Sequence, residues 1–388
     1  MGSTPISDTI RLALSVAGRL ELSGLLMHLP LRSSRSVLFA GSVVVAAVAV
    51  TSCSTTASSP AASLTSTTSK AGTTLIPATV TLALSWTPNT DYTGVYVANA
   101  KGYFAEQGIT VKVLPYGSTA PETLISRGLA DFGFTYQAGL VYARAAGGDL
   151  VSVFAPDQKG TYAIGVKADR TDITSPKNLD GKTYAGFGTP DEGPELKSII
   201  EHAGGKGIFK TVTLNTSAYE ALYTGQVDFT IPVVTWEGVE ARLVGKPIKT
   251  FAFTDYGFPD QYSVLIASSR KYLVANPDLA KRFLAALTKG YAFAADNSAA
   301  AAQIVITTNP GVFSNPQLVI DSQALLVSGG YLKNAQGGVG TQDSNEWEKY
   351  GLFLYSNGLL ADGSGTKLVT EPDWSTYYTN AYLPASNP

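Results

Sequence analysis

Short β-branched runs alternate with helical stretches from Thr79 onward, and this alternation limits the fold more than any other feature. Residues 79–86 alternate apolar and polar side chains as a strand does, residues 94–106 have a helical pattern, and residues 110–114 form the next predicted strand. The rhythm continues through residues 131–136, 150–154, 182–187, 211–215, 227–234 and 248–253, and beyond residues 261–268 the chain becomes mostly helical. Strands separated by helices pair mainly in parallel, so the sequence predicts an α/β architecture.

The composition allows a large core and narrows the chemistry. The chain has 388 residues, of which 45% are hydrophobic and 15% are charged, which is enough for more than one domain. Its net charge of −2 argues against a nucleic-acid partner. The chain has one cysteine and two histidines, too few for a disulfide framework or a Cys/His metal cluster. The motif Gly186-x-Gly188 lacks the third glycine of a dinucleotide-binding loop. We therefore expect no resident metal and no cofactor.

The N-terminal region has the pattern of a processing signal. Arg32 and Arg35 precede the apolar run 37–50, which ends in Val50-Thr51-Ser52-Cys53 and is too short to cross a bilayer comfortably. An apolar run followed by small residues and a cysteine resembles the bacterial lipobox, in which the cysteine is acylated and becomes the first residue. Residues 1–52 are thus a predicted signal peptide, with Met27 as an alternative start, and Cys53 is the predicted lipidation site. A buried apolar helix with an incidental cysteine is the alternative.

A low-complexity segment follows Cys53. Residues 54–74 are mostly Ser, Thr and Ala without a periodic apolar face, so they cannot bury enough surface to offset their ordering entropy. We expect residues 53–78 to be a tether between the membrane and the folded part.

A weak internal repeat indicates two related lobes. The pattern Glu-x-Leu followed by Gly-x-x-Asp-Phe occurs over residues 122–132 and again over residues 220–229. Two similar α/β lobes would explain the repeat, and chance similarity between two βα units is the alternative.

Aromatic and polar side chains follow several predicted strands. Ligands of open α/β sheets bind beyond the carboxyl ends of the strands, so these side chains are candidate ligand contacts. The candidates are Trp86, Asn89, Tyr92, Tyr136, Gln137, Asp157, Gln158, Glu192, Trp236 and Glu237. The set suits a flat ring with polar edges held between aromatic side chains, although each residue alone could serve packing instead.

Sequence motifs along the folded part resemble one family. The family is that of solute-binding proteins for thiamine pyrimidine precursors. The similar motifs are residues 84–98, Lys101-Gly102-Tyr103-Phe104, Ala130-Asp131-Phe132-Gly133, residues 175–182 and Trp236-Glu237-Gly238-Val239-Glu240. The resemblance runs in order from about residue 80 to residue 355. It implies the small-molecule-binding component of an ABC importer, with a permease and an ATPase as partners. It also implies a monomer that is anchored by lipid at the extracytoplasmic face of the cell membrane and is not an enzyme.

The resemblance also implies a type II periplasmic-binding-protein fold. Its first lobe would comprise residues 79–170 and 261–388, its second lobe residues 171–260, with hinge segments near residues 165–167 and 261–264. A ligand cleft would lie between the lobes. Trp86, Asn89 and Tyr136 would face Glu192, Trp236 and Glu237 across this cleft, with Glu192 accepting hydrogen bonds from an exocyclic amine.

Two departures from the family pattern leave the ligand open. The family usually has histidine where Tyr92 stands, and a Gln-His-Asn stretch where this chain has Gln158-Lys159-Gly160. An alkanesulfonate, a nitrile or a flavin are alternative ligands. The superfamily also contains fungal thiamine-pyrimidine synthases, which consume an active-site histidine and use a cysteine-rich motif for iron. This chain has no cysteine after Cys53, and His202 is its one histidine there, at a predicted helix end, which disfavours that activity.

Overall fold

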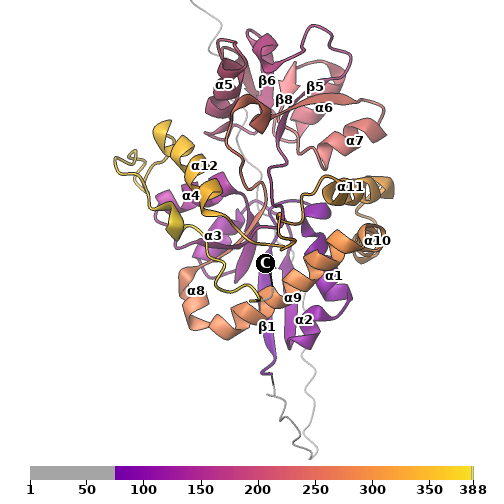
Figure 1. Cartoon of the computed structure of the whole chain (residues 1–388), viewed down its shortest axis with the longest axis vertical. Coiled ribbons are helices and arrows are strands. Elements are labelled where there is room, and N and C mark those ends of the chain that lie inside the picture. Colours follow the sequence, from indigo (N-terminus) through magenta and orange to yellow (C-terminus); the bar gives the residue numbers. More distant parts are fainter. Residues whose placement is uncertain (1–74, 386, 388) are drawn as a thin grey trace, which may run out of the picture. The chain divides into compact units, whose positions relative to one another are not determined.

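Two five-stranded mixed sheets form the framework of the protein (Figure 1). The computed structural model describes residues 75–385 and residue 387. The first sheet has the order β2-β1-β3-β10-β4, with β1 Ala78–Ala83, β2 Ile109–Leu114, β3 Phe132–Thr135, β4 Val151–Phe154 and β10 Leu265–Ser268. The second sheet has the order β7-β6-β8-β5-β9, with β5 Ala163–Lys167, β6 Thr183–Gly186, β7 Lys210–Thr213, β8 Phe229–Thr230 and β9 Ile248–Ala252. The predicted α/β architecture is confirmed.

Helices accompany both sheets. Beside the first sheet Figure 1 shows α1 Thr93–Ala100, α2 Tyr103–Glu106, α3 Pro121–Ser126, α4 Gln137–Ala145, α8 Arg270–Ala275, α9 Pro277–Asp296, α10 Ser298–Thr308, α11 Pro316–Ser328 and α12 Ser344–Ser356. Beside the second lie α5 Glu192–His202, α6 Ser217–Thr224 and α7 Glu237–Leu243. Short 3₁₀ turns occur at η1 Thr90–Tyr92, η2 Pro176–Leu179, η3 Phe253–Tyr256 and η4 Trp374–Thr376.

Two predicted elements differ from the structure. The helix predicted over residues 94–106 is divided into α1 and α2, because Gly102 adopts a φ of 75° that an α-helix cannot contain. The strand predicted over residues 227–234 is shortened to Phe229–Thr230, with a separate β-bridge between Val233 and Tyr162. Pro232 follows closely and has no N–H to donate to a neighbouring strand, which shortens β8.

The internal repeat corresponds to the same structural unit in both sheets. Asp131 precedes β3, and its carboxylate accepts a hydrogen bond from the Thr81 backbone N–H of β1 at 2.7 Å. Asp228 precedes β8, and its carboxylate accepts one from the Thr183 backbone N–H of β6 at 2.8 Å. In each case the two strands are parallel neighbours, so the repeated aspartate joins equivalent strands in the two sheets.

The chain passes between the sheets twice, and the strands at these passages run antiparallel to their neighbours. After β4 it enters the second sheet through β5, which pairs antiparallel with β8 and β9. After β9 it returns through β10, which pairs antiparallel with β3 and β4. The sequence predicts residues 165–167 as a hinge segment within the first lobe, whereas in the structure they lie in β5 of the second sheet. We therefore propose that the crossing segments are residues 155–162 and 257–264.

The two crossing segments are held side by side by hydrogen bonds. The Gly160 backbone N–H donates to the Asp260 carboxylate at 2.8 Å, and the Thr161 backbone N–H donates to the Ser263 hydroxyl at 2.8 Å. A methyl group at position 160 would lie 2.7 Å from an Asp260 carboxylate oxygen and 3.2 Å from the Gln261 carbonyl oxygen. Close approach of the two segments therefore requires glycine at this position.

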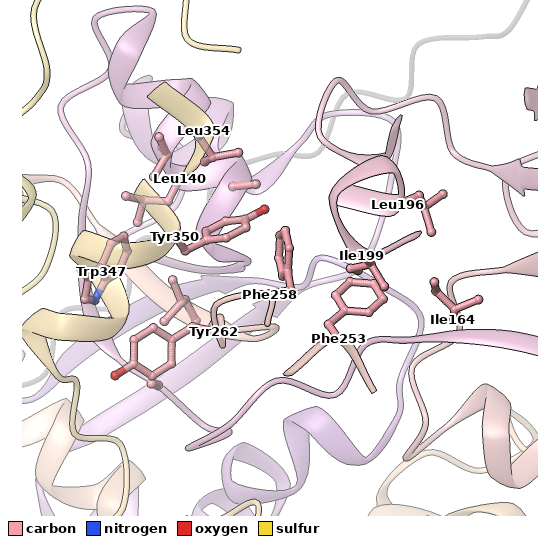
Figure 2. Close-up of a cluster of buried hydrophobic side chains, with 14 of the residues drawn as sticks. Leu140, Ile164, Leu196, Ile199, Phe253, Phe258, Tyr262, Trp347, Tyr350 and Leu354 are labelled. Atoms are coloured by element: carbon pink, nitrogen blue, oxygen red, sulfur yellow. The ribbon is translucent and has the colours of Figure 1, made fainter. Parts of the chain in front are cut away.

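A buried apolar seam joins elements of both sheets near these crossings (Figure 2). From the first lobe it contains Leu140 of α4 with Trp347, Tyr350 and Leu354 of α12; from the second, Ile164 of β5 with Leu196 and Ile199 of α5. Phe253 of η3 belongs to the same cluster, as do Phe258 and Tyr262 on the returning crossing. Because this apolar surface is removed from water, the seam stabilises the junction between the lobes.

Substitution of Gly160 tests the packing of the crossings. We expect Gly160→Ala to lower the free energy of unfolding by about 1–3 kcal/mol, because the added methyl group overpacks the contact with Asp260 and Gln261. Gly117→Ala is the matched control, since a methyl group there meets no atom within 4 Å. Urea unfolding measures both variants, and equal stability of the two would contradict the close packing of the crossings.

Candidate functional site

A cavity of about 290 Å³ lies where the carboxyl ends of strands from both sheets meet the two crossings. Side chains that follow β1, β3, β6 and β8 line it, together with residues of both crossing segments. The lining comprises Ser85, Trp86, Asn89, Asp91, Tyr92, Thr135, Tyr136, Thr161, Tyr162, Phe187, Thr189, Asp191, Glu192, Glu195, Tyr219, Ile231, Val233, Trp236, Glu237, Gln261, Ser263 and Val264. A second hollow of about 530 Å³ shares Trp86, Tyr219, Trp236 and Glu237 with this cavity.

Seven of the ten candidate ligand contacts named from the sequence line the cavity. They are Trp86, Asn89, Tyr92, Tyr136, Glu192, Trp236 and Glu237. Tyr92 is buried, and its hydroxyl lies 3.2 Å from the Ser85 hydroxyl. The Asn89 side-chain Oδ1 accepts the Asp91 backbone N–H at 2.9 Å, which shapes the turn η1 at the edge of the cavity. The predicted lipidation site, Cys53, lies outside the described residues.

The other three candidates, Gln137, Asp157 and Gln158, do not line the cavity. The Gln137 side chain accepts the Tyr262 backbone N–H at 2.9 Å and donates to the Glu346 carbonyl at 3.1 Å. The Gln158 amide donates to the Ala155 carbonyl at 2.8 Å. Both amides therefore satisfy buried backbone groups near the crossings, which gives them a structural role.

Aromatic side chains of both lobes form the walls of the cavity. Its aromatic residues are Trp86, Tyr92, Tyr136, Tyr162, Phe187, Tyr219 and Trp236. The rings of Trp86, which follows β1, and Phe187, which follows β6, lie 6.0 Å apart with an interplanar angle of 67°. Phe187 in turn lies 6.3 Å from Tyr219. Aromatic walls contributed by two lobes suit a flat ring enclosed between them.

Five carboxylates also line the cavity, and burial raises the pKa of each. They are Asp91, Asp191, Glu192, Glu195 and Glu237. Removal from water raises the pKa of Asp91 to about 6, and that of Glu195 and of Glu237 to about 8. Burial shifts the pKa of Asp191 and of Glu192 in the same direction. Asp191 and Glu195 belong to the same helical turn as Glu192, so helical spacing from Glu192 could have identified them in the sequence.

Hydrogen bonds fix these carboxylates in place. The Tyr350 hydroxyl donates to Glu195 at 2.6 Å, and the Val233 backbone N–H donates to Glu237 at 3.1 Å. Glu192 accepts the backbone N–H groups of Phe187 and Gly188 at 2.8 and 3.0 Å. The loop at residues 186–188 therefore wraps around a carboxylate of the protein itself.

Two polar groups of the cavity wall have no hydrogen-bond partner within the described part of the chain. They are the Thr161 hydroxyl and the Gln261 amide nitrogen, one on each crossing segment, and both residues are buried. Buried polar groups are normally paired, and the Gln261 side chain also interacts with Glu195 and lowers its pKa, so the Thr161 hydroxyl is the clearer partner for a bound solute. Asp157 is also fully buried, and neither of its carboxylate oxygens has a partner among the described residues, but it does not line the cavity. Burial, with the nearby Asp91 charge, holds its pKa well above the usual range.

Residues 75–385 and 387 contain no group of three or more His, Cys, Asp or Glu side chains that could hold a metal ion. His202 is the last residue of α5, is exposed, and does not line the cavity. Within the same residues, no helix is long and apolar enough to cross a membrane.

Comparison with known proteins identifies the family. The family described as NMT1/THI5 like matches residues 89–301, more than half of the chain, and the protein belongs to this family. The formylaminopyrimidine-binding protein of Halalkalibacterium halodurans is 28% identical over 289 residues, covering 73% of this chain and 86% of that protein. The 4-amino-5-hydroxymethyl-2-methylpyrimidine phosphate synthase of Legionella pneumophila is 24% identical over 325 residues, covering 79% and 92%.

A solved structure establishes the fold. The alkanesulfonate-binding protein SsuA from Xanthomonas axonopodis pv. citri superimposes with a TM-score of 0.56 at 15% identity, covering 79% of this chain and 98% of that one. The predicted periplasmic-binding-protein fold is thus confirmed. Fold, family and cavity together define a two-lobed solute-binding protein of the NMT1/THI5 type.

The buried carboxylates predict that stability falls as the pH rises. The pKa of about 8 for Glu195 and Glu237 lies above the value of about 4.3 expected in the unfolded chain, so the folded protein retains protons that the unfolded chain loses. The contribution of these two groups to the free energy of unfolding is fully present below about pH 4 and is lost as the pH rises through 8. Between these values we expect the free energy of unfolding to fall by roughly 1 kcal/mol per pH unit for each group.

Urea unfolding at a series of pH values measures this slope. The double variant Glu195→Gln/Glu237→Gln should have a flatter profile than the unsubstituted protein, because its amides do not titrate. Profiles of equal slope would show that these carboxylates are not desolvated in the folded state.

Proposed function

We propose that this chain is the extracytoplasmic solute-binding component of an ABC importer, and that its solute is a thiamine pyrimidine precursor or a similar small heteroaromatic compound. The observation that carries the proposal is the cavity between the lobes, which combines aromatic walls with buried carboxylates and unpaired polar groups. The similarity to a protein named for formylaminopyrimidine binding supports the solute class. A permease and an ATPase are the partners that this function requires.

The cavity suggests a role for each kind of side chain. Trp86 and Trp236 contribute aromatic surface from the two lobes, which suits stacking on a flat ring. Glu237 accepts hydrogen bonds from backbone N–H groups alone, those of Val233 and of Glu237 itself, and therefore retains lone pairs for an exocyclic amine. Glu192 already accepts two backbone N–H groups, so in this proposal it mainly orders the loop at residues 186–188 beside the ring.

We propose binding rather than synthesis as the activity, although a similar protein is named as a pyrimidine phosphate synthase. The described lining of the cavity contains no histidine and no cysteine. Its acids are fixed by hydrogen bonds and surrounded by aromatic side chains, an arrangement that favours recognition of a ring.

We also propose that Cys53 carries the lipid anchor, since the run at residues 37–50 and the small residues before Cys53 form a processing signal. Mass spectrometry of the membrane fraction should find acylated Cys53 as the first residue. A mature chain that begins upstream of Cys53 would refute this anchor.

Calorimetry with an aminopyrimidine tests the proposed function. We expect 4-amino-5-hydroxymethyl-2-methylpyrimidine to bind, and Glu237→Gln to weaken binding by about ten- to a hundredfold, because an amide N–H in place of a carboxyl oxygen leaves a buried amine donor unpaired at a cost of roughly 1–3 kcal/mol. This variant should melt no lower than the unsubstituted protein, since a desolvated carboxylate is removed.

Two controls accompany this measurement. Glu192→Ala should lower the melting temperature as well as the affinity, because it frees the backbone N–H groups of Phe187 and Gly188. Glu348→Gln, on the exposed surface outside the cavity, should change neither. Tight binding of a flavin, sulfonate or nitrile with no response to pyrimidines would refute the proposed solute class.

A further inference from the structure

The charge of the cavity has one sign. All five charged side chains that line it are acidic, and the described lining contains no lysine, arginine or histidine. None of the five forms an ion pair with another described residue. The hollow beside it adds Glu220 and Glu240 against a single Lys246. A solute that enters this site therefore meets acidic groups that no basic side chain of the described lining compensates.

The aromatic walls have no cation of their own either. In the described part of the chain, lysine and arginine side chains lie over the rings of Tyr103, Phe251, Phe293, Tyr331 and Tyr377, and none of these rings belongs to the cavity. Among the described residues no lysine or arginine therefore competes with a cationic solute for the rings of Trp86 and Trp236, and tryptophan is the aromatic side chain that attracts cations best.

Two backbone donors that could hold an anion are already used. Helix α5 begins at Glu192, and a helix N-terminus ordinarily attracts negative charge. Here Asp191, Glu192 and Glu195 supply that negative charge from the first turn itself. Glu192 also accepts the N–H groups of Phe187 and Gly188, which a phosphate or sulfonate would otherwise require. An anionic solute would find few donors and several repelling carboxylates.

The unpaired groups of the two crossings show that the cavity is built to hold a solute. The Thr161 hydroxyl is fully buried, lines the cavity and has no hydrogen-bond partner among the described residues. The Gln261 amide nitrogen, on the other crossing, makes no hydrogen bond of good geometry, although the Gln261 side chain interacts with Glu195 and lowers its pKa. These two neutral groups can pair with ring heteroatoms, while the five carboxylates face the charged part of the solute.

We propose that the cavity selects heteroaromatic solutes that carry a positive charge and rejects anionic ones, including phosphate esters and sulfonates. This inference rests on the proposed function and narrows its solute class. The cation is held between the aromatic faces of Trp86 and Trp236 and the carboxylates of Asp91, Glu195 and Glu237.

Proton release is a second consequence of this arrangement. In the empty protein the raised pKa values keep part of the carboxylate set protonated near pH 7. The groups that face Glu237 and Glu195 across the site are Asp91, Asp191, Glu192 and Glu240, all acidic, together with the hydroxyl groups of Tyr350 and Tyr219. A bound cation lowers the pKa of these carboxylates, so binding should release protons and tighten as the pH rises.

Three probes that share one ring test the selection. All carry the 4-amino-2-methylpyrimidine ring, and the substituent at position 5 is trimethylammoniomethyl, hydroxymethyl or phosphonooxymethyl. Calorimetry at pH 7.5 should show the cation binding at least tenfold more tightly than the neutral probe, and the phosphate ester at least a hundredfold more weakly than the cation. The double variant Glu195→Gln/Glu237→Gln should lose most of the preference for the cation.

Matched controls make the outcome decisive. The double variant Asp255→Asn/Glu348→Gln removes the same charge from exposed positions outside the cavity and should keep the preference. If the cavity variant does not fold, the unsubstituted protein still tests the proposal through the heat of cation binding in two buffers of different ionisation enthalpy, which should reveal released protons. A neutral probe that binds as tightly as the cation would overturn the charge selection and leave the proposed function standing. Failure of all three probes to bind would overturn both.

Discussion

Burial of like charge beside aromatic rings is the interaction on which the rest of this structure depends. Five carboxylates share one cavity, and none has a basic partner among the described residues. Desolvation of such groups opposes folding, so the fold must offset its cost elsewhere. The seam of Figure 2 supplies apolar burial beside the crossings, and Tyr350 of that seam donates directly to Glu195. The hydrogen bond between Tyr350 and Glu195 thus connects the apolar seam that joins the lobes to the acidic wall of the cavity.

The same residue pair connects the site to the junction between the lobes. Tyr350 belongs to α12, which belongs with the first sheet, whereas Glu195 lies on α5 beside the second. The crossings contribute Thr161 and Gln261 to the cavity wall, so the segments that join the lobes also face the solute. A solute that pairs with these groups contacts both lobes and both crossings. Its binding can therefore favour one arrangement of the lobes over another.

Much of the fold and part of the site could be predicted from the sequence, for identifiable physical reasons. The alternation of strands and helices follows from side-chain periodicity, and the rule that ligands bind beyond strand ends identified Trp86, Glu192 and Trp236 as residues of the cavity wall.

The rule that ligands bind beyond strand ends does not determine which way each side chain points. Gln137 directly follows Tyr136, yet its amide turns to the crossing backbone. The sequence also did not predict that β5 belongs to the second sheet, because the residues of a strand do not determine which sheet the strand joins. Asp91, Asp191 and Glu195 were missed because isolated acids usually face solvent, and only the meeting of two lobes buries them together.

The central claim is that a flat heteroaromatic ring is enclosed between the two lobes with its donors directed at these carboxylates. A crystal structure of the chain grown with the bound aminopyrimidine tests it most directly. The account predicts electron density for the ring between Trp86 and Trp236, with its exocyclic amine within hydrogen-bond distance of Glu237 and a ring nitrogen near Thr161 or Gln261. A ring bound elsewhere on the protein, with this cavity holding only solvent at a saturating solute concentration, would contradict the account.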